Sequence, residues 1–251
     1  MLTRERKAHI LNLLDAKGRV IAKDLSRELS LSEDTIRRDL RELASTGLLQ
    51  RVHGGALPAS PAIADFTQRQ SIATEGKTAI GRKAAAIVEP GQIVFIDGGT
   101  TATQMALHLP RDLRATVVTH SPSIAIALAE HPSIEVELIG GRLFKHSIVS
   151  VGAVAAEAIM RVRADLYFMG VTGVHPEIGL TTGDAEEASI KRLLSKQAAE
   201  TIVMASHEKL GAVSPSVVLP LSKISTLVLE TGLKQPLIEP YRRLGFTIVT
   251  A

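Results

Sequence analysis

The segment LSEDTIRRDLRELASTGLLQRVHGGAL, residues 31–57, predicts a capped helix followed by a short hairpin. Ser32 can cap the helix, because its hydroxyl can accept a hydrogen bond from a first-turn N–H group. Apolar residues then recur at helical spacing and define one stripe, formed by Ile36, Leu40 and Leu43. Gly47 can end the helix in a left-handed conformation, which leaves residues 48–57 for two short strands and a tight turn.

The side of this predicted helix that faces away from the apolar stripe is basic. Rotating by about 100° per residue from Ile36 places Arg38 and Arg41 on that side. Thr35 and Arg37 flank it. Such a helix suits a DNA major groove, because arginine can bond a guanine edge through two donors. Exposed arginines are also common on ordinary helices, so the sequence upstream has to decide between the two interpretations.

Two further helices are predicted upstream, one from Thr3 to about Ala16 and one over residues 22–29. Together with the helix after Ser32 they give a helix-turn-helix arrangement, to which the hairpin adds a wing. Residues 1–60 hold 11 Lys and Arg against 8 Asp and Glu, so the whole net charge of +3 lies there. This bias favours a DNA-binding domain over a helical domain that serves interaction alone.

The composition excludes several classes of protein. The chain has 251 residues and no run of 18 or more apolar residues, which predicts no transmembrane helix. The charged N-terminal stretch does not resemble a signal peptide. Cysteine is absent, which excludes disulfides and thiolate zinc sites, and we expect a cytoplasmic protein. Tryptophan is absent and aromatic residues make up 3% of the chain, so stacking platforms for single-stranded nucleic acid are not expected.

Residues 2–57 resemble the DNA-binding domain of the DeoR family of bacterial transcription regulators. The resemblance rests on RERKAHIL, on DLSRELSLSEDTIRRDLRELASTGLLQRVHGGA, and above all on TIRRDL and R-x-HGGA. It implies a winged helix-turn-helix that contacts double-stranded DNA. We expect Arg37 and Arg38 to read bases, and further contacts, some of them to phosphate, from Ser32, Thr35, Arg41, Arg51 and His53.

The rest of the chain predicts an α/β domain with a mainly parallel sheet, because buried apolar runs alternate with helical patterns. The strands are expected at residues 93–96, 115–119, 134–139, 166–171, 201–205, 225–229 and 246–249. The expected helices cover residues 76–88, 103–109, 122–130, 151–160, 186–196 and 237–244. A proline-bearing linker at 58–75 would separate a DNA-binding domain at 1–57 from an effector-binding and oligomerisation domain at 76–251.

The first predicted strand of this domain runs into Asp97-Gly98-Gly99-Thr100-Thr101. Glycines between a strand and a helix let an anion approach the backbone, and a helix N-terminus offers free N–H groups to phosphate. A purely structural turn is the alternative. Neither the Walker pattern nor G-x-G-x-x-G is present, so no nucleotide cofactor is expected. Similar polar or glycine-containing segments follow three other strands, and all four are expected to converge, at 97–101, 140–142, 170–173 and 206–211.

The body of the chain also resembles the effector domain of the DeoR family, itself similar to phosphosugar isomerases such as ribose-5-phosphate isomerase. The resemblance rests on DGGTT, GGR, GVTGV…GLTT, EEASIKR and HEKLG. It implies a phosphorylated sugar, with Asp97 accepting a sugar hydroxyl or holding the loop. The other implied effector contacts are Gly98, Gly99, Thr100, Thr101, Gly141, Arg142, Glu187, Lys191 and Lys209. Glu187 and Lys191 could instead form a helix-surface ion pair. The family usually has Asp at the position of Ser206, and commonly Asn at that of His120.

An isomerase needs a base next to the carbonyl carbon, yet residues 140–152 contain no Asp or Glu and only His146 as a candidate. Catalysis by Asp97, Asp184 or Glu187 remains an alternative, as does a metabolite-binding scaffold. No histidine spacing indicates a metal site. We therefore expect a homo-oligomeric repressor, a dimer or tetramer, that controls a carbohydrate catabolic operon and is released from DNA by a phosphorylated sugar, without catalysis or cofactor.

Overall fold

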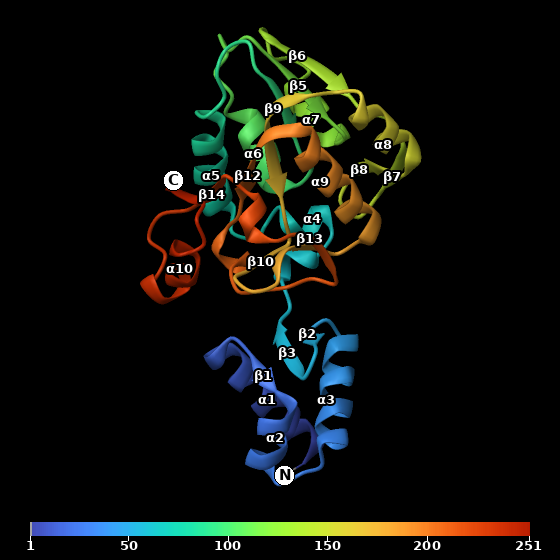
Figure 1. Cartoon of the computed structure of the whole chain (residues 1–251), viewed down its shortest axis with the longest axis vertical. Coiled ribbons are helices and arrows are strands. Elements are labelled where there is room, and N and C mark those ends of the chain that lie inside the picture. Colours follow the sequence, from blue (N-terminus) through green and yellow to red (C-terminus); the bar gives the residue numbers. More distant parts are fainter. Residues whose placement is uncertain (1) are drawn as a thin grey trace.

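The computed structural model describes residues 2–251, which form a small head (residues 2–58) and a larger body (residues 74–251). Figure 1 shows the head set apart from the body and joined to it by the chain that leaves the head's last strand. We call residues 59–73 the linker; it contains the short helices η1 (Pro61–Ile63) and α4 (Phe66–Arg69). Among the described residues, no helix is long and apolar enough to cross a membrane.

The head is a winged helix-turn-helix, as the sequence predicts. Its elements are α1 (Thr3–Lys17), β1 (Val20–Ile21), α2 (Ala22–Leu29), α3 (Glu33–Ser45), β2 (Leu49–Val52) and β3 (Gly55–Pro58). The predicted stripe of α3 is buried in a core that it shares with α1 and α2, including Ile10 and Leu25. β3 pairs with both β1 and β2, so the wing is fastened to the helices by a three-stranded sheet.

The body is built on one seven-stranded parallel sheet, which confirms the predicted fold class. The strand order is β15-β14-β12-β9-β4-β5-β6. These strands are β4 (Ile93–Ile96), β5 (Ala115–Thr119), β6 (Ile134–Leu138), β9 (Ala164–Gly170), β12 (Ala198–Met204), β14 (Thr226–Leu229) and β15 (Thr247–Thr250). Neighbours β12, β9 and β4 lie in the middle of the sheet, while β6 is an edge strand.

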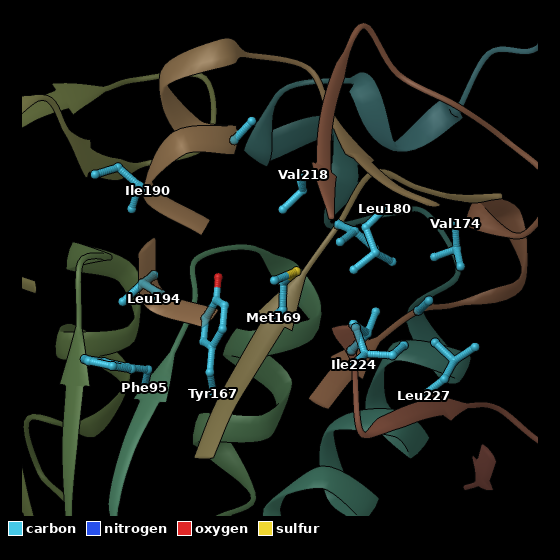
Figure 2. Close-up of a cluster of buried hydrophobic side chains, with 14 of the residues drawn as sticks. Phe95, Tyr167, Met169, Val174, Leu180, Ile190, Leu194, Val218, Ile224 and Leu227 are labelled. Carbon is cyan, nitrogen blue, oxygen red and sulfur yellow. The ribbon is translucent and has the colours of Figure 1, made fainter. Parts of the chain in front are cut away.

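Helices cover both faces of this sheet, which explains why its strands are continuous apolar runs. Their bounds are α5 (Thr74–Ala85), α6 (Thr100–Leu107), α7 (Pro122–Leu128), α8 (Ala153–Met160), α9 (Ala185–Gln197) and α10 (Gln235–Arg242). In β4, Val94 and Ile96 pack into the core formed with α5, α6 and α7. Phe95 points into the opposite core, formed with α8 and α9, where its ring meets Tyr167 edge-on (Figure 2).

Several short strands are missing from the sequence prediction. Residues 151–160, predicted as one helix, contain the end of β8 (Val149–Val151) before α8 begins, and β8 forms a hairpin with β7 (Arg142–Phe144). A separate antiparallel sheet joins β10 (Gly173–His175), β11 (Gly179–Thr182) and β13 (Ser216–Leu219). Two further short helices, η2 (His207–Lys209) and η3 (Leu221–Lys223), follow β12 and β13. Helix α6 begins at Thr100 rather than at residue 103, so the threonines belong to its first turn.

Candidate nucleic-acid interface and anion site

Helix α3 presents an exposed polar face. Its cap forms as predicted, since the Ser32 hydroxyl accepts a hydrogen bond from the Thr35 N–H at 3.2 Å. Arg38 and Arg41 are exposed, and neither forms an ion pair among residues 2–251. Arg37 is also exposed but lies 3.0 Å from the Glu33 carboxylate. The face is therefore available to a nucleic acid, with two arginines that have no competing carboxylate.

The wing adds two further exposed candidates, Arg51 on β2 and His53 in the turn that follows it. β2 packs directly against α3, so the predicted contacts of the wing lie on the element next to the recognition helix. None of the seven predicted DNA-contact residues is buried, although Thr35 is partly covered.

One residue of the TIRRDL motif has a structural role that the sequence analysis did not assign. The side chain of Asp39 is buried beneath α3 and accepts hydrogen bonds from the guanidinium of Arg6 on α1, with Nη2 to Oδ1 at 3.0 Å. This two-point pairing fixes α3 against α1. The motif thus combines an inward aspartate that orients the helix with outward arginines.

In the body, a pocket lies at the carboxyl ends of the central strands β4, β9 and β12. Three of the four segments that were expected to converge line it, with Gly98–Thr101 after β4, Gly170–Thr172 after β9 and Lys209 after β12. The prediction is wrong for residues 140–142, because they follow the edge strand β6 and β5 separates that strand from β4. Glu187 and Lys191 of α9 form another part of the lining.

Gly141 and Arg142 therefore lie apart from this pocket. The β7–β8 hairpin carries the Arg142 side chain to the surface, where it is 61% exposed and forms an ion pair with Glu186. Gly141 has a positive φ of 149° and its missing Cβ would approach Ala155 to 3.1 Å, which indicates a packing role at the start of the hairpin.

The N-terminus of α6 opens into the pocket. Gly99 precedes it with a φ of 117° and offers no side chain to cap the first turn. Gly98 is equally constrained, because a Cβ there would lie 2.2 Å from a methyl group of Val149. The first-turn N–H groups of Thr100, Thr101 and Ala102 are thus left for a ligand, and the helix dipole adds partial positive charge at the same point.

Three buried cations face this helix end, and we call Arg69, Lys77 and Lys209 the cation group. None of them forms an ion pair among the described residues 2–251. Burial lowers the pKa of Lys209 to about 8, against the opposing effect of Glu208, and the neighbouring cations Lys77 and Arg69 lower it further. Its ammonium has one long contact, 3.4 Å to the Thr101 hydroxyl.

Arg69 and Lys77 were not identified from the sequence. The Nε and Nη2 atoms of Arg69 are buried and have no hydrogen-bond partner within residues 2–251, and burial lowers the pKa of its guanidinium. The Lys77 ammonium donates to the main-chain carbonyl of Arg69 at 2.6 Å, and burial lowers its pKa as well. Buried charges without partners are energetically unfavourable, so this group of cations favours the binding of an anion.

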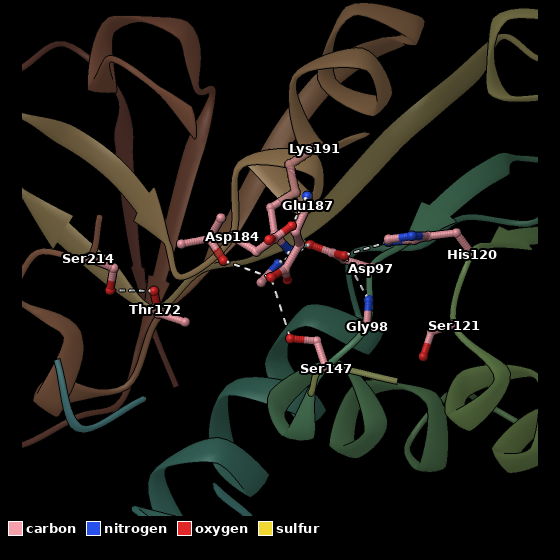
Figure 3. Close-up of polar contacts among 12 residues, drawn as sticks. Asp97, Gly98, His120, Ser121, Ser147, Thr172, Asp184, Glu187, Lys191 and Ser214 are labelled. Atoms are coloured by element: carbon pink, nitrogen blue, oxygen red, sulfur yellow. Dashed lines mark hydrogen bonds and ion pairs between the residues drawn. The ribbon is translucent and has the colours of Figure 1, made fainter. Parts of the chain in front are cut away.

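A second set of buried charged and titratable side chains extends from the Glu187–Lys191 wall of the pocket into the body, and we call Asp97, His120, Glu187 and Lys191 the Asp97 cluster (Figure 3). The Asp97 carboxylate accepts five hydrogen bonds. One oxygen accepts from Gly98 N and His120 Nε2, both at 2.8 Å. The other accepts from the Tyr167 hydroxyl, the Gly170 N–H and the Lys191 ammonium. With five donors, Asp97 has no capacity left for a sugar hydroxyl and holds the loop instead.

The ionisable groups of the Asp97 cluster contact one another. Burial alone raises the pKa of the Asp97 carboxyl, but Lys191 and His120 outweigh burial and hold the pKa below its ordinary range. His120 Nδ1 lies 2.9 Å from the Ser150 carbonyl oxygen and Nε2 lies 2.8 Å from the Asp97 carboxylate, so both ring nitrogens face oxygen atoms. The carboxylate of Glu187 lies 3.2 Å from Lys191 and accepts from Thr182 and Ser147. Both carboxylates of the cluster therefore contact the Lys191 ammonium and further polar groups.

Comparison with known proteins agrees with this arrangement. A family model described as a DeoR-like helix-turn-helix domain matches residues 6–61, and one described as a DeoR C terminal sensor domain matches residues 72–231. The chain is 38% identical to the HTH-type transcriptional regulator GlpR of Haloferax volcanii, over 99% of this chain and 98% of that protein. The chain belongs to the DeoR family of transcriptional regulators.

Two more distant likenesses complete the comparison of this DeoR-family chain. It is 31% identical to the glycerol-3-phosphate regulon repressor of Escherichia coli K12, over 82% of each protein. The solved structure of ribose 5-phosphate isomerase A from Methanocaldococcus jannaschii superimposes with a TM-score of 0.40 and 15% identity, over 53% of this chain and 52% of that one. A likeness of that degree carries no argument about function.

Two positions at which this DeoR-family chain departs from the family's usual pattern lie close to the site. His120 stands where the resemblance implies asparagine and places its Nε2 atom 2.8 Å from the Asp97 carboxylate. Ser206 replaces the usual aspartate; its buried hydroxyl donates to Glu208, the residue beside Lys209. The Glu187–Lys191 pair is buried inside the cluster and is not a helix-surface pair.

Proposed function

We propose that this DeoR-family regulator is a sequence-specific repressor of a carbohydrate catabolic operon and that a phosphorylated sugar releases it from DNA. The observation that carries the proposal is the cation group, three buried cations without acidic partners that face the uncapped end of α6. A phosphate dianion is the ligand that this chemistry favours, because it accepts N–H groups and balances several cations at once.

The sugar part would extend over the pocket wall formed by Thr172, Thr182 and Glu187. The hydroxyl groups of Thr172 and Thr182 are of the kind that hydrogen-bond a polyol, whereas the Glu187 carboxylate is already engaged by Lys191, Thr182 and Ser147. The name of the glycerol-3-phosphate regulon repressor supports a small phosphorylated polyol or sugar as the ligand class. Residues 1–57 would bind the operator, and residues 76–251 would sense the effector and form the homo-oligomer.

The site favours sensing over catalysis. Within the described residues, Glu187 is the one carboxylate that lines the pocket, and Lys191, Thr182 and Ser147 all engage it. A general base for isomerisation needs a free lone pair directed at the substrate. Asp97 is excluded from that role by its five donors, and His146 donates to the Ile63 carbonyl. We therefore propose that the chain is not an enzyme.

A gel shift tests this function directly. The full chain is mixed with the DNA upstream of its own gene, and the titration is repeated with glycerol 3-phosphate, fructose 1-phosphate, ribose 5-phosphate and glucose 6-phosphate. Specific binding that one of these compounds weakens supports a phosphate-sensing repressor. Specific binding that none of them alters contradicts the sensing half of the proposal, and no binding at low salt contradicts the DNA-binding half.

A further inference from the structure

The anion pocket is not made by the body alone, because the linker runs along it. Ala62 of η1 and Arg69 of α4 both line the pocket, and both belong to the segment that joins the head to the body. Ala62 is buried, as is most of Arg69. A ligand in the pocket would therefore contact the same stretch of chain that carries the DNA-binding head.

The linker is also fastened to the loops that build the site. The buried Ser60 hydroxyl donates to the main-chain carbonyl of Thr172, a residue of the pocket wall. Thr172 is itself hydrogen-bonded through its side chain to Ser214 at 2.7 Å (Figure 3). η1 packs against η2, which carries Lys209. A change in the pocket thus reaches the linker through Thr172 and through η2.

Arg69 is the linker residue with unsatisfied chemistry. Its Nε and Nη2 atoms are buried without partners, while its carbonyl is held by the Lys77 ammonium. An anion could accept hydrogen bonds from these two atoms and so pair the buried charge of Arg69. Charge-assisted hydrogen bonds of this kind are strong for a single side chain. A bound ligand would therefore act on the linker through the Arg69 side chain.

At its other end the linker leads directly into the head. The carbonyl of Pro58, the last residue of β3, accepts from the Val213 N–H at 3.2 Å, and Ala59 forms a β-bridge to Val213. One ion pair among the described residues joins head and body directly, Arg19 with Glu177 at 4.0 Å, and both side chains are exposed. Exposed pairs of this kind stabilise little, whereas Pro58 and Ala59 are attached to Val213 by backbone contacts.

We propose that Arg69 is an effector-binding residue and that the linker transmits the occupancy of the pocket to the head. The anionic group, bound at the first turn of α6, draws the Arg69 guanidinium onto itself. The shift of the linker changes the attachment of Ser60 to Thr172 and of Pro58 and Ala59 to Val213. The inference rests on the proposed function, because it needs an anionic ligand and an operator. Coupling between two such sites typically changes affinity by about 5- to 150-fold.

Arg69→Gln and Lys209→Gln form a matched pair for the first test. Both variants remove one cation from the pocket, so both should bind the effector more weakly. At saturating effector, confirmed by calorimetry, Lys209→Gln should release the operator as the natural protein does. Arg69→Gln should bind the effector yet change its operator affinity by less than about twofold, instead of the usual 5- to 150-fold. Full release by saturated Arg69→Gln overturns the inference.

Hydrogen exchange on the natural protein tests the same inference without a substitution. With inorganic phosphate or ribose 5-phosphate as the probe, amides of Thr100–Ala102 report the anion site and amides of residues 59–72 report the linker. Slower exchange at Thr100–Ala102 together with altered exchange in the linker supports transmission. Slower exchange at Thr100–Ala102 alone overturns transmission, and no change at either segment overturns the anion site and with it the proposed function.

A reversible disulfide between two introduced cysteines provides a third test, because the natural chain contains no cysteine of its own. Bridge partners in a sheet lie within the Cα separation that a disulfide needs, so Ala59→Cys with Val213→Cys should form a cross-link on oxidation. The oxidised protein should still bind the effector but no longer respond to it in operator binding, and reduction should restore the response. An undiminished response in the oxidised protein overturns the inference.

Discussion

Two sets of buried charges lie side by side in the body, and they differ in how completely they are paired. In the Asp97 cluster the Lys191 ammonium contacts both carboxylates, and Asp97 alone accepts five hydrogen bonds. In the cation group, Arg69, Lys77 and Lys209 line one pocket, and none of them forms an ion pair with a carboxylate of residues 2–251. The first set is paired within the protein, whereas the second leaves buried donors of Arg69 without a partner among residues 2–251.

This difference separates structural from functional charges more clearly than burial does. Lys191 and Lys209 are both at least 95% buried, yet Lys191 contacts two carboxylates and Lys209 contacts none within ion-pair distance among residues 2–251. The pKa of Lys191 is raised because Asp97 and Glu187 outweigh burial, while burial lowers that of Lys209 to about 8. The head repeats the contrast, with Arg6 paired to Asp39 and Arg38 unpaired.

The largest expected effect comes from Lys191→Met. The substitution leaves Asp97 and Glu187 buried with too little positive charge, and breaking a buried pair in this way costs roughly 3–5 kcal/mol of unfolding free energy. Urea denaturation followed by circular dichroism measures it. Lys209→Met, a loss of the same side chain from the neighbouring set, is the control. Equal stability losses in the two variants would remove the distinction between the two sets.

Lys209→Met should leave the unfolding free energy nearly unchanged and weaken ligand binding. Only one long hydrogen bond is lost, and the cost of burying an unpaired ammonium is removed with it, so the unfolding free energy should stay within about 1 kcal/mol of the natural value. Binding of a phosphorylated sugar should weaken by roughly 1.5–3 kcal/mol, or about 10- to 150-fold, in calorimetry. Unchanged affinity would show that Lys209 does not contact the ligand.

In the head, Arg38→Ala should weaken operator binding by about 1–3 kcal/mol and relax the base preference at one position. Arg51→Ala, in the wing, should weaken binding to all sequences alike and lower the salt slope by about 1. Fluorescence anisotropy over a range of salt concentrations separates these effects. Arg111→Ala, an exposed arginine of the body, is the control. Operator binding by Arg38→Ala with natural affinity and specificity would refute the proposed register of α3.

The smallest expected effect is a pH dependence. A bound phosphate raises the pKa of Lys209 above its unliganded value of about 8, so ligand affinity is complete below about pH 8 and falls as the pH rises through that value. The fall is at most about tenfold per pH unit for one group. Phosphate esters are already dianionic above about pH 7 and add no titration there. Calorimetry on the natural protein and on Lys209→Met should show the dependence in the first and not in the second.

Much of the fold follows from sequence pattern, since each strand of the large sheet is a short apolar run bounded by turn residues and local pattern suffices to find it. The short antiparallel strands do not follow from local pattern. β11 pairs with β13 through residues far apart in the sequence, such as Leu180 and Leu219, and each strand of the β7–β8 hairpin has only three residues. Such strands carry too few residues for a period to show. The start of α6 was misplaced because Thr100 and Thr101 have weak helix propensity and the glycine before them resembles a loop.

The site was predictable only as far as it follows the strand ends. Gly98–Thr101 and Lys209 line the pocket because β4 and β12 flank β9, and the motifs DGGTT and HEKLG pointed to them. Arg142 belongs to the equally suggestive motif GGR, which follows β6. The position of β6 at the edge of the sheet depends on the tertiary structure and cannot be predicted from local sequence. Arg69 lies on a four-residue helix without periodicity, and only its unpartnered buried nitrogens reveal it.

The strand order has a consequence for synthesis of the chain. The head has its own core within residues 10–56, whereas the pocket needs β4, β9 and finally η2 with Lys209. Domains generally fold as units, the N-terminal one first during translation. The ribosome therefore releases a complete DNA-reading surface some 150 residues before the last cation of the sensor emerges. During that interval the helix-turn-helix head can fold while the pocket of the body is still incomplete.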